Sequence, residues 1–254
     1  MPIPESLAAR AIVGKMGAEP NMNHSNHSLV IQTPTAPAQQ LILLFHGVGS
    51  DPQAMQPLGQ RLADDFPNAM VVSTAAANPS SLGRGFEWFS VIGITEDNRV
   101  DRINAAMPAF MACVAHWQNQ SGVAAAATAL IGFSQGAIMA LESAKQNPPP
   151  AGRIVAIGGR FATLPGEALL DVTVHFLHGK DDAVIPYSNS VLAAHHLRDL
   201  GSDVTAEVLP FIGHEVHPEF VELVRTKLTT HIPHRVWAQA LAADQGNRPQ
   251  GTPS

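Results

Sequence analysis

The chain has 254 residues, of which 45% are hydrophobic and only 14% are charged. A chain of this length and composition can bury a large core, which excludes an intrinsically disordered protein. The formal net charge of −6 gives no support for nucleic acid or an anionic membrane surface as a partner.

The first residues differ in composition from the rest of the chain. Residues 1–27 are polar and rich in Pro, Asn and His, so we expect a flexible N-terminal extension. Met22, close before the first strand-like run, is an alternative natural start. Arg10 and Lys15 separate the apolar residues of this region, so it does not contain the uninterrupted apolar run of a signal peptide.

Seven apolar runs have the length and composition of strands, and helical patterns separate most of them. The predicted strands are 28–33, 41–47, 70–75, 128–134, 153–159, 172–179 and 203–210. The predicted helices are 52–66, 95–120, 135–146, 189–200 and 217–231. Near-continuous apolar strands that alternate with helices predict an α/β fold, with a mostly parallel central sheet and helices on both faces. Residues 28–240 contain no internal repeat and no long linker, which favours a single domain.

The sequence GFSQG (132–136) lies where a predicted strand passes into a predicted helix. Ser134 stands at the carboxyl end of the strand, where open parallel sheets bind their ligands. A tight strand-to-helix turn leaves no room for side chains two positions before and after its centre, which explains Gly132 and Gly136. The pattern G-x-S-x-G in this context predicts a nucleophile elbow, with an ordinary turn serine as the alternative.

A serine hydroxyl attacks a carbonyl only when a base takes its proton and a carboxylate fixes the tautomer of that base. After an elbow of this type the acid comes first along the chain and the histidine second. Asp181 and Asp182 follow the strand 172–179, and the pattern alone leaves open which of them is the acid. His214, after the strand 203–210, is the predicted base.

The other eleven histidines are weaker candidates for the base. We expect His217 to open the last helix, with a metal pair between His214 and His217 as a minor alternative. His175 and His178 lie in a strand and at its end, and we interpret them as structural. Most of the rest fall in the extension, within helices or beyond the last helix.

An acyl-transfer site also needs two backbone N–H groups for the oxygen that becomes negative. One is predicted to come from Gln135, directly after the nucleophile. The other is predicted to come from Val48, because Gly47 and Gly49 let the segment HGVGSDP bend toward the cavity. His46 is interpreted as a side chain that holds this loop.

The chain ends in a polar segment, 241–254, for which we expect a mobile tail. Cys113 is the only cysteine, so there is no intramolecular disulfide and no zinc-finger spacing. No run approaches the roughly 18 apolar residues of a membrane span. These features favour a cytoplasmic protein without stable membrane insertion.

The motifs LLFHGVGSD, EWFS, GFSQGAIMAL, HGKDDAVIP and GHEV occur in register. In this order they resemble the phospholipase/carboxylesterase family of α/β-hydrolases, which includes acyl-protein thioesterases and small bacterial carboxylesterases. The resemblance implies an α/β-hydrolase fold and a catalytic triad of Ser134, His214 and Asp182, with Asp182 as the acid rather than Asp181. It also implies Val48 as an oxyanion donor, and a reaction that needs neither a cofactor nor a metal.

The resemblance fails at one position of the segment EWFS. Family members usually carry W-F-D or W-Y-D where this chain has Trp88, Phe89 and Ser90. We expect Trp88 and Phe89, with Leu82 and Phe86 nearby, to wall a substrate-binding acyl pocket, and ordinary core packing is the alternative.

The predicted function is that of a carboxylesterase, which cleaves small acyl esters of short to medium chain length through an acyl-enzyme on Ser134. The segment 78–95, which should form part of the pocket mouth, shows no long apolar flap. Acyl-protein thioesterase or lysophospholipase activity with the same triad is the alternative, and a non-catalytic binding protein of the same fold is a weaker one. Members of this family often dimerise, so a homodimer is a further expectation.

Overall fold

The computed structural model describes residues 27–239. The predicted N-terminal extension, apart from His27, and the predicted tail lie outside the described residues. The strands of the main sheet are β1 (Leu29–Gln32), β2 (Gln40–Phe45), β3 (Ala69–Thr74), β6 (Thr128–Phe133), β7 (Arg153–Ile157), β8 (Thr173–Gly179) and β9 (Asp203–Leu209).

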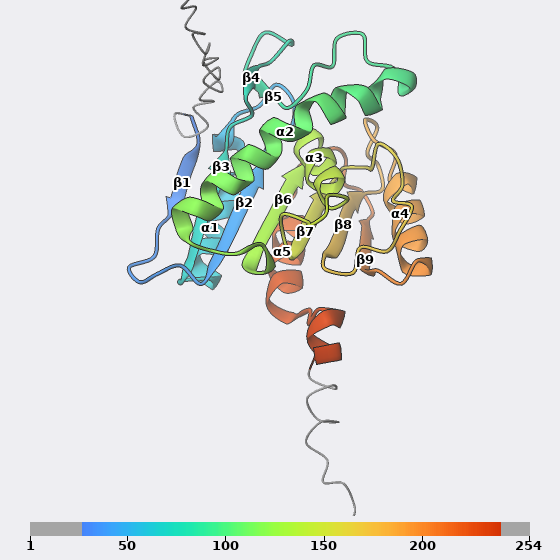
Figure 1. The fold of residues 1–254 in the computed structure, drawn as a ribbon. Coiled ribbons are helices and arrows are strands. Elements are labelled where there is room, and N and C mark those ends of the chain that lie inside the picture. Colours follow the sequence, from blue (N-terminus) through green and yellow to red (C-terminus); the bar gives the residue numbers. More distant parts are fainter. Residues whose placement is uncertain (1–26, 240–254) are drawn as a thin grey trace, which may run out of the picture.

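These seven strands form one sheet in the order β1-β3-β2-β6-β7-β8-β9 (Figure 1). Only β1 runs antiparallel to its neighbour, and the other strands pair in parallel. The predicted α/β fold with a mostly parallel sheet is therefore confirmed. Because the strands are parallel, the loops that follow β2, β6, β8 and β9 emerge at the same edge of the sheet.

Four α-helices connect strands and α5 follows β9, and each of the five lies within a few residues of its predicted range. They are α1 (Gln56–Asp65), α2 (Glu96–Ser121), α3 (Gln135–Ser143), α4 (Ser188–Asp199) and α5 (Pro218–Thr230). Short 3₁₀ turns precede α1 at Pro52–Met55 and β6 at Ala125–Ala127. Within residues 27–239, no helix is long and apolar enough to cross a membrane.

A small hairpin of β4 (Asn78–Pro79) and β5 (Phe86–Glu87) was not predicted from the sequence. Its strands have two residues each, which is too short for a periodic pattern to appear. The hairpin packs onto the loop after β2, where Gly49 N–H donates to the carbonyl of Phe86 at 2.9 Å. It therefore belongs to the sheet edge where the candidate site lies.

The two faces of the sheet bury separate hydrophobic cores. Leu41, Leu43 and Phe45 of β2 face the core that α2, α3 and α4 cover. Ile42 and Leu44 face the smaller core beneath α1 and α5. Figure 1 shows α2 crossing in front of the sheet. Both faces are covered, which is why nearly every residue of the central strands is apolar.

Capping residues mark an end of three of these helices. The Asp51 carboxylate accepts the backbone N–H of Gln53 at 3.0 Å, ahead of the turn that leads into α1. The Thr95 hydroxyl accepts the N–H of Asn98, and the Asn98 side chain accepts the N–H of Thr95 in return. Gly201 follows α4 with a φ of +90°, a left-handed conformation that favours glycine.

Candidate active site

Ser134 lies at the junction of β6 and α3, in a conformation that serine rarely adopts. Its φ is +53° and its ψ is −115°, so the chain turns sharply from strand into helix at this residue. Ser134 and Phe211 are the only non-glycine residues with positive φ in the part of the chain that the structure describes. The strain holds the hydroxyl away from the backbone at the N-terminus of α3, as an elbow requires.

The glycines on either side of Ser134 fill places that have no room for a side chain. A Cβ on Gly132 would lie 2.4 Å from the backbone nitrogen of Ala137, in the first turn of α3. A Cβ on Gly136 would lie 2.3 Å from the carbonyl oxygen of Phe45, at the end of β2. The first glycine thus lets α3 fold back onto β6, and the second lets it approach the neighbouring strand.

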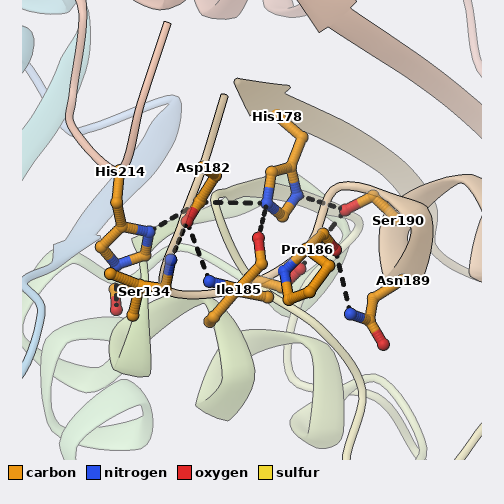
Figure 2. A network of polar contacts seen from close by, with 10 residues as sticks. Ser134, His178, Asp182, Ile185, Pro186, Asn189, Ser190 and His214 are labelled. Carbon is orange, nitrogen blue, oxygen red and sulfur yellow. Dashed lines mark hydrogen bonds and ion pairs between the residues drawn. The ribbon is translucent and has the colours of Figure 1, made fainter. Parts of the chain in front are cut away.

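The predicted nucleophile, base and acid meet at the sheet edge. His214 Nε2 lies 2.8 Å from Ser134 Oγ, and His214 Nδ1 lies 2.7 Å from Asp182 Oδ2 (Figure 2). The three residues follow β6, β9 and β8, so the parallel sheet brings together side chains that are up to 80 residues apart. Asp181 is exposed, and within the part of the chain that the structure describes only its backbone N–H is bound, to the carbonyl of Ile212.

The Asp182 side chain is only 1% exposed, yet it stays ionised. Burial alone would raise its pKa, but hydrogen bonds from His214 and from the N–H groups of Ile185 and Val184 outweigh burial, so that the pKa lies below its usual value. Both backbone bonds reach Oδ1 at 2.8 Å. Oδ2 faces His214, and the ionised carboxylate accepts a hydrogen bond from the Nδ1–H group. This leaves Nε2 without a proton, free to accept a hydrogen bond from the serine hydroxyl.

The His214 ring is packed on two sides and remains 16% exposed at its side chain. The ring of Phe133 lies against it, with 4.9 Å between the ring centroids. Gly158, at the end of β7, lies beneath the Asp–His pair with a φ of +56°. A Cβ there would be 3.4 Å from both Asp182 Oδ2 and His214 Nδ1.

The loop after β2 presents an N–H group beside the nucleophile. Gly47 lies so close to Ser134 that a Cβ on the glycine would be 3.3 Å from that of the serine. The carbonyl oxygen of Gly47 lies 2.7 Å from His46 Nδ1 and also accepts the N–H of Ser50 at 3.3 Å. In a trans peptide the following N–H points the opposite way, so the N–H of Val48 points away from both donors. Within the described chain this N–H has no protein acceptor.

His46 holds this loop with both ring nitrogens. Its Nε2 accepts the N–H of Ala76 at 3.2 Å, so its proton is on Nδ1 and is donated to Gly47. Burial lowers the pKa of His46, which keeps the ring neutral. The contacts of His46 are those of the loop-holding side chain that the sequence suggested.

Gln135 joins the elbow to the segment that follows β5. Its backbone N–H, at the first position of α3, has no acceptor within the helix. Its side-chain oxygen accepts the N–H of Trp88 at 2.8 Å, and its amide nitrogen donates to the carbonyl of Phe89 at 2.6 Å. The sequence did not reveal this second task of Gln135, because no periodic pattern relates a helix to a distant loop.

Trp88 and Phe89 are themselves buried, at 6% and 5% exposed. Trp88 packs against Phe45 and Phe110, and its indole N–H donates to the carbonyl of His46 at 2.9 Å. Both residues thus belong to the hydrophobic core, and contact with a substrate stays a prediction.

Two further histidines, His217 and His178, lie near the site. His217 caps α5, where its Nδ1 accepts the N–H of Glu219 at 3.2 Å, as expected for the residue that opens the last helix. Across residues 27–239 no group of three or more potential ligands could hold a metal ion. His178, interpreted from the sequence as structural, is fully buried, and its Nε2 lies 3.1 Å from Asp182 Oδ2.

The chain is similar to known proteins over most of its length. The sequence pattern of the Phospholipase/Carboxylesterase family matches residues 26–232. Esterase YpfH of Escherichia coli (strain K12) is 47% identical over 221 residues, which cover 87% of this chain and 94% of that protein. Acyl-protein thioesterase 1 of Gibberella zeae is 30% identical over 121 residues, 44% of this chain and 52% of that protein.

Solved structures show the same fold. The crystal structure of esterase PE8 superposes with a TM-score of 0.68 at 30% identity, over 79% of this chain and 95% of that chain. A carboxylesterase from Mesorhizobium loti superposes with a TM-score of 0.65 over 76% of this chain and 90% of its own. At 21% identity the second likeness supports the fold alone.

Proposed function

This chain belongs to the phospholipase/carboxylesterase family and is a carboxylic ester hydrolase, and we propose that Ser134, His214 and Asp182 are its catalytic triad. The observation that carries the proposal is the unbroken contact from Ser134 Oγ through His214 to Asp182 Oδ2, at 2.8 and 2.7 Å. Each distance lies within hydrogen-bond reach, as activation of a serine requires.

In the proposed reaction His214 takes the proton of Ser134 as the hydroxyl oxygen attacks the ester carbonyl. The tetrahedral intermediate collapses, the C–O bond to the alcohol breaks, and His214 returns the proton to the departing alkoxide. Water then attacks the acyl-enzyme with His214 as the base, and the acid leaves Ser134 with its proton restored. Asp182 stays ionised throughout and stabilises the imidazolium.

The negative oxygen of both intermediates would be bound by the backbone N–H groups of Val48 and Gln135. Among residues 27–239 neither group has a protein acceptor. Gln135 follows Ser134 directly, and Val48 follows Gly47, which lies close to Ser134. The N-terminus of α3 adds its positive dipole end at the same place. In a site of this type the loss of one donor costs about 2.7–4 kcal/mol of transition-state stabilisation.

The proposed substrates are small acyl esters of short to medium chain length. The segment between β4 and α2 is held in place by hydrogen bonds, such as those from the Arg102 guanidinium to the carbonyls of Ser90 and Ile92 at 2.8 and 2.7 Å. The large hydrophobic side chains that this segment exposes are Leu82 and Ile92, which are too few to cover a long acyl chain. A panel of nitrophenyl esters and acyl thioesters from about two to sixteen carbons tests this proposal. An optimum at the long end, or a preference for thioesters, would replace it by thioesterase activity.

Ser134→Ala tests the triad itself. The change removes only the hydroxyl, so we expect a folded protein whose hydrolysis of a short-chain nitrophenyl ester falls by orders of magnitude. Activity retained in this variant would rule out Ser134 as the nucleophile.

We further propose that the protein acts in the cytoplasm and as a homodimer. Cys113, the only cysteine in the sequence, is fully buried, and burial raises its pKa to about 12, so it takes no part in disulfide chemistry. Sedimentation velocity on the purified protein tests the dimer, and a single species with the mass of one chain would contradict it.

A further inference from the structure

His178 lies near the end of β8, completely buried, and makes contact with the candidate triad (Figure 2). Its Nε2 is 3.1 Å from Asp182 Oδ2, the oxygen that also accepts from His214. We propose that His178 is a positioning residue of the active site, which holds the Asp182 carboxylate in the orientation that His214 needs. The proposal rests on the proposed triad.

The neighbours of His178 determine where its proton lies. Nε2 faces two acceptors, Asp182 Oδ2 at 3.1 Å and the carbonyl oxygen of Ile185 at 2.8 Å, so it carries the proton. Nδ1 lies 2.8 Å from the hydroxyl of Ser190, which can donate to it. Burial lowers the pKa of His178, so the ring remains neutral with this tautomer.

The same contacts close the acid loop into a small ring of hydrogen bonds. His178 donates to the carbonyl of Ile185, and the N–H of Ile185 donates to Asp182 Oδ1 at 2.8 Å. His178 also donates to Oδ2, so both carboxylate oxygens accept hydrogen bonds from groups other than His214. A carboxylate has about four acceptor positions, and those of Asp182 are filled by His214, His178 and two backbone N–H groups.

This arrangement determines how Asp182 can move. The backbone N–H groups of Val184 and Ile185 fix Oδ1. The carboxylate could still turn about this fixed oxygen, and such a turn would move Oδ2 away from His214. The hydrogen bond from His178 opposes that rotation. Ser190, at the start of α4, in turn holds the His178 ring. The triad is thus supported by a second imidazole on the far side of its carboxylate.

Two amide replacements separate this task from simple packing. In His178→Gln the side-chain nitrogen can occupy the place of Nε2 and still donate to Asp182. In His178→Asn the shorter side chain places its amide near Nδ1, beside Ser190, and Asp182 loses a donor. We expect kcat to fall about tenfold or more in His178→Asn, with KM within about twofold, and to stay within about threefold of the parent enzyme in His178→Gln.

A double-mutant cycle shows whether His178 acts through Asp182. In an Asp182→Ala background there is no carboxylate to hold, so His178→Asn should lower the residual kcat by less than about twofold. A packing role predicts losses that multiply instead, because the two substitutions would then act independently.

His175 provides the matched control, because it is equally buried in the same strand and also bonds a hydroxyl, that of Thr205, at 2.9 Å. His175→Asn should leave kcat unchanged. The proposal is overturned if His178→Gln loses as much kcat as His178→Asn, if the losses multiply in the cycle, or if both His178 variants fail to fold. Ser134→Ala keeps the two proposals apart, because its inactivity would support the triad whatever the His178 variants do.

Discussion

Asp182 Oδ2 lies 2.7 Å from His214 Nδ1, and this contact favours Asp182 over the adjacent Asp181 as the acid of the proposed triad. In Asp182→Asn the amide would no longer accept the Nδ1 proton as a carboxylate does, and the imidazole would adopt the wrong tautomer. We expect kcat to fall by roughly 10²–10⁴-fold, the upper figure being that of a serine protease with the equivalent change. Steady-state hydrolysis of a short nitrophenyl ester measures the loss.

Asp181→Asn is the control for that change, since it makes the same substitution one residue earlier. The Asp181 side chain is exposed, and only its backbone N–H is bound, to Ile212. Activity should stay within about twofold of the parent enzyme. A larger loss in Asp181→Asn than in Asp182→Asn would mean that the acid has been assigned to the wrong residue.

The loop after β2 carries Val48, the proposed oxyanion donor. The effect of a His46 substitution on kcat should depend on which ring nitrogen the new side chain replaces. His46→Asn keeps a donor near Nδ1, for the carbonyl of Gly47, and His46→Gln keeps an acceptor near Nε2, for the N–H of Ala76. Only the first bond orients the Val48 N–H. Removal of a whole oxyanion donor typically lowers kcat by about 10²–10³-fold. We expect His46→Gln to lose part of this, roughly tenfold or more in kcat, and His46→Asn to lose less. Equal losses in kcat would contradict this account of the loop.

The elbow glycines should resist even the smallest side chain. Gly136→Ala places a Cβ about 2.3 Å from the Phe45 carbonyl oxygen, and Gly132→Ala places one 2.4 Å from Ala137. We expect the free energy of unfolding to fall by about 3 kcal/mol in each, near the upper end for overpacked positions. Gly166→Ala, where nothing lies within 4 Å, should change it by less than about 0.5 kcal/mol. Urea titration measures all three, and similar values for all would contradict the packing argument.

Stability should depend on pH through His175. Burial, the largest cause, lowers its pKa to about 3, whereas the unfolded chain has the ordinary value near 6.5. Between these values the unfolded state binds a proton that the folded state does not, so the free energy of unfolding falls as pH falls, by up to about 1.4 kcal/mol per pH unit. In His175→Leu the free energy of unfolding should depend less steeply on pH between about pH 6 and about pH 4. Unfolding curves with equal pH slopes for the two proteins would contradict this.

The strands and helices could be predicted because each buried strand is an almost continuous apolar run and each helix has a recognisable start or end. The β4–β5 hairpin could not, because its strands have two residues each. Ser134 and His214 could be singled out as candidates for a similar reason, since their local patterns are distinctive. The acid was left open by the residue pattern, because Asp181 and Asp182 are neighbours and only the path of the loop decides which is buried.

Contacts between distant segments were beyond the reach of the sequence. His178 was interpreted as structural because it lies at the end of a strand, and its contact with Asp182 could not be predicted because the turn between them has no pattern of its own. Gly158 went unnoticed for the same reason, although its lack of a side chain makes room for Asp182 and His214. Trp88 and Phe89 were suggested as pocket walls; both are buried, and their backbone groups form hydrogen bonds with the side chain of Gln135.

The central claim is that Ser134 becomes acylated, and trapping the acyl-enzyme tests it most directly. The enzyme is mixed with a short-chain nitrophenyl ester, quenched in acid within the first turnovers, digested and analysed by mass spectrometry. We predict that the acyl group is found on Ser134, in the peptide that contains the turn from β6 into α3, and that no acylated peptide forms in Ser134→Ala. An acyl group on any other residue, or ester turnover that persists in Ser134→Ala, would contradict the account.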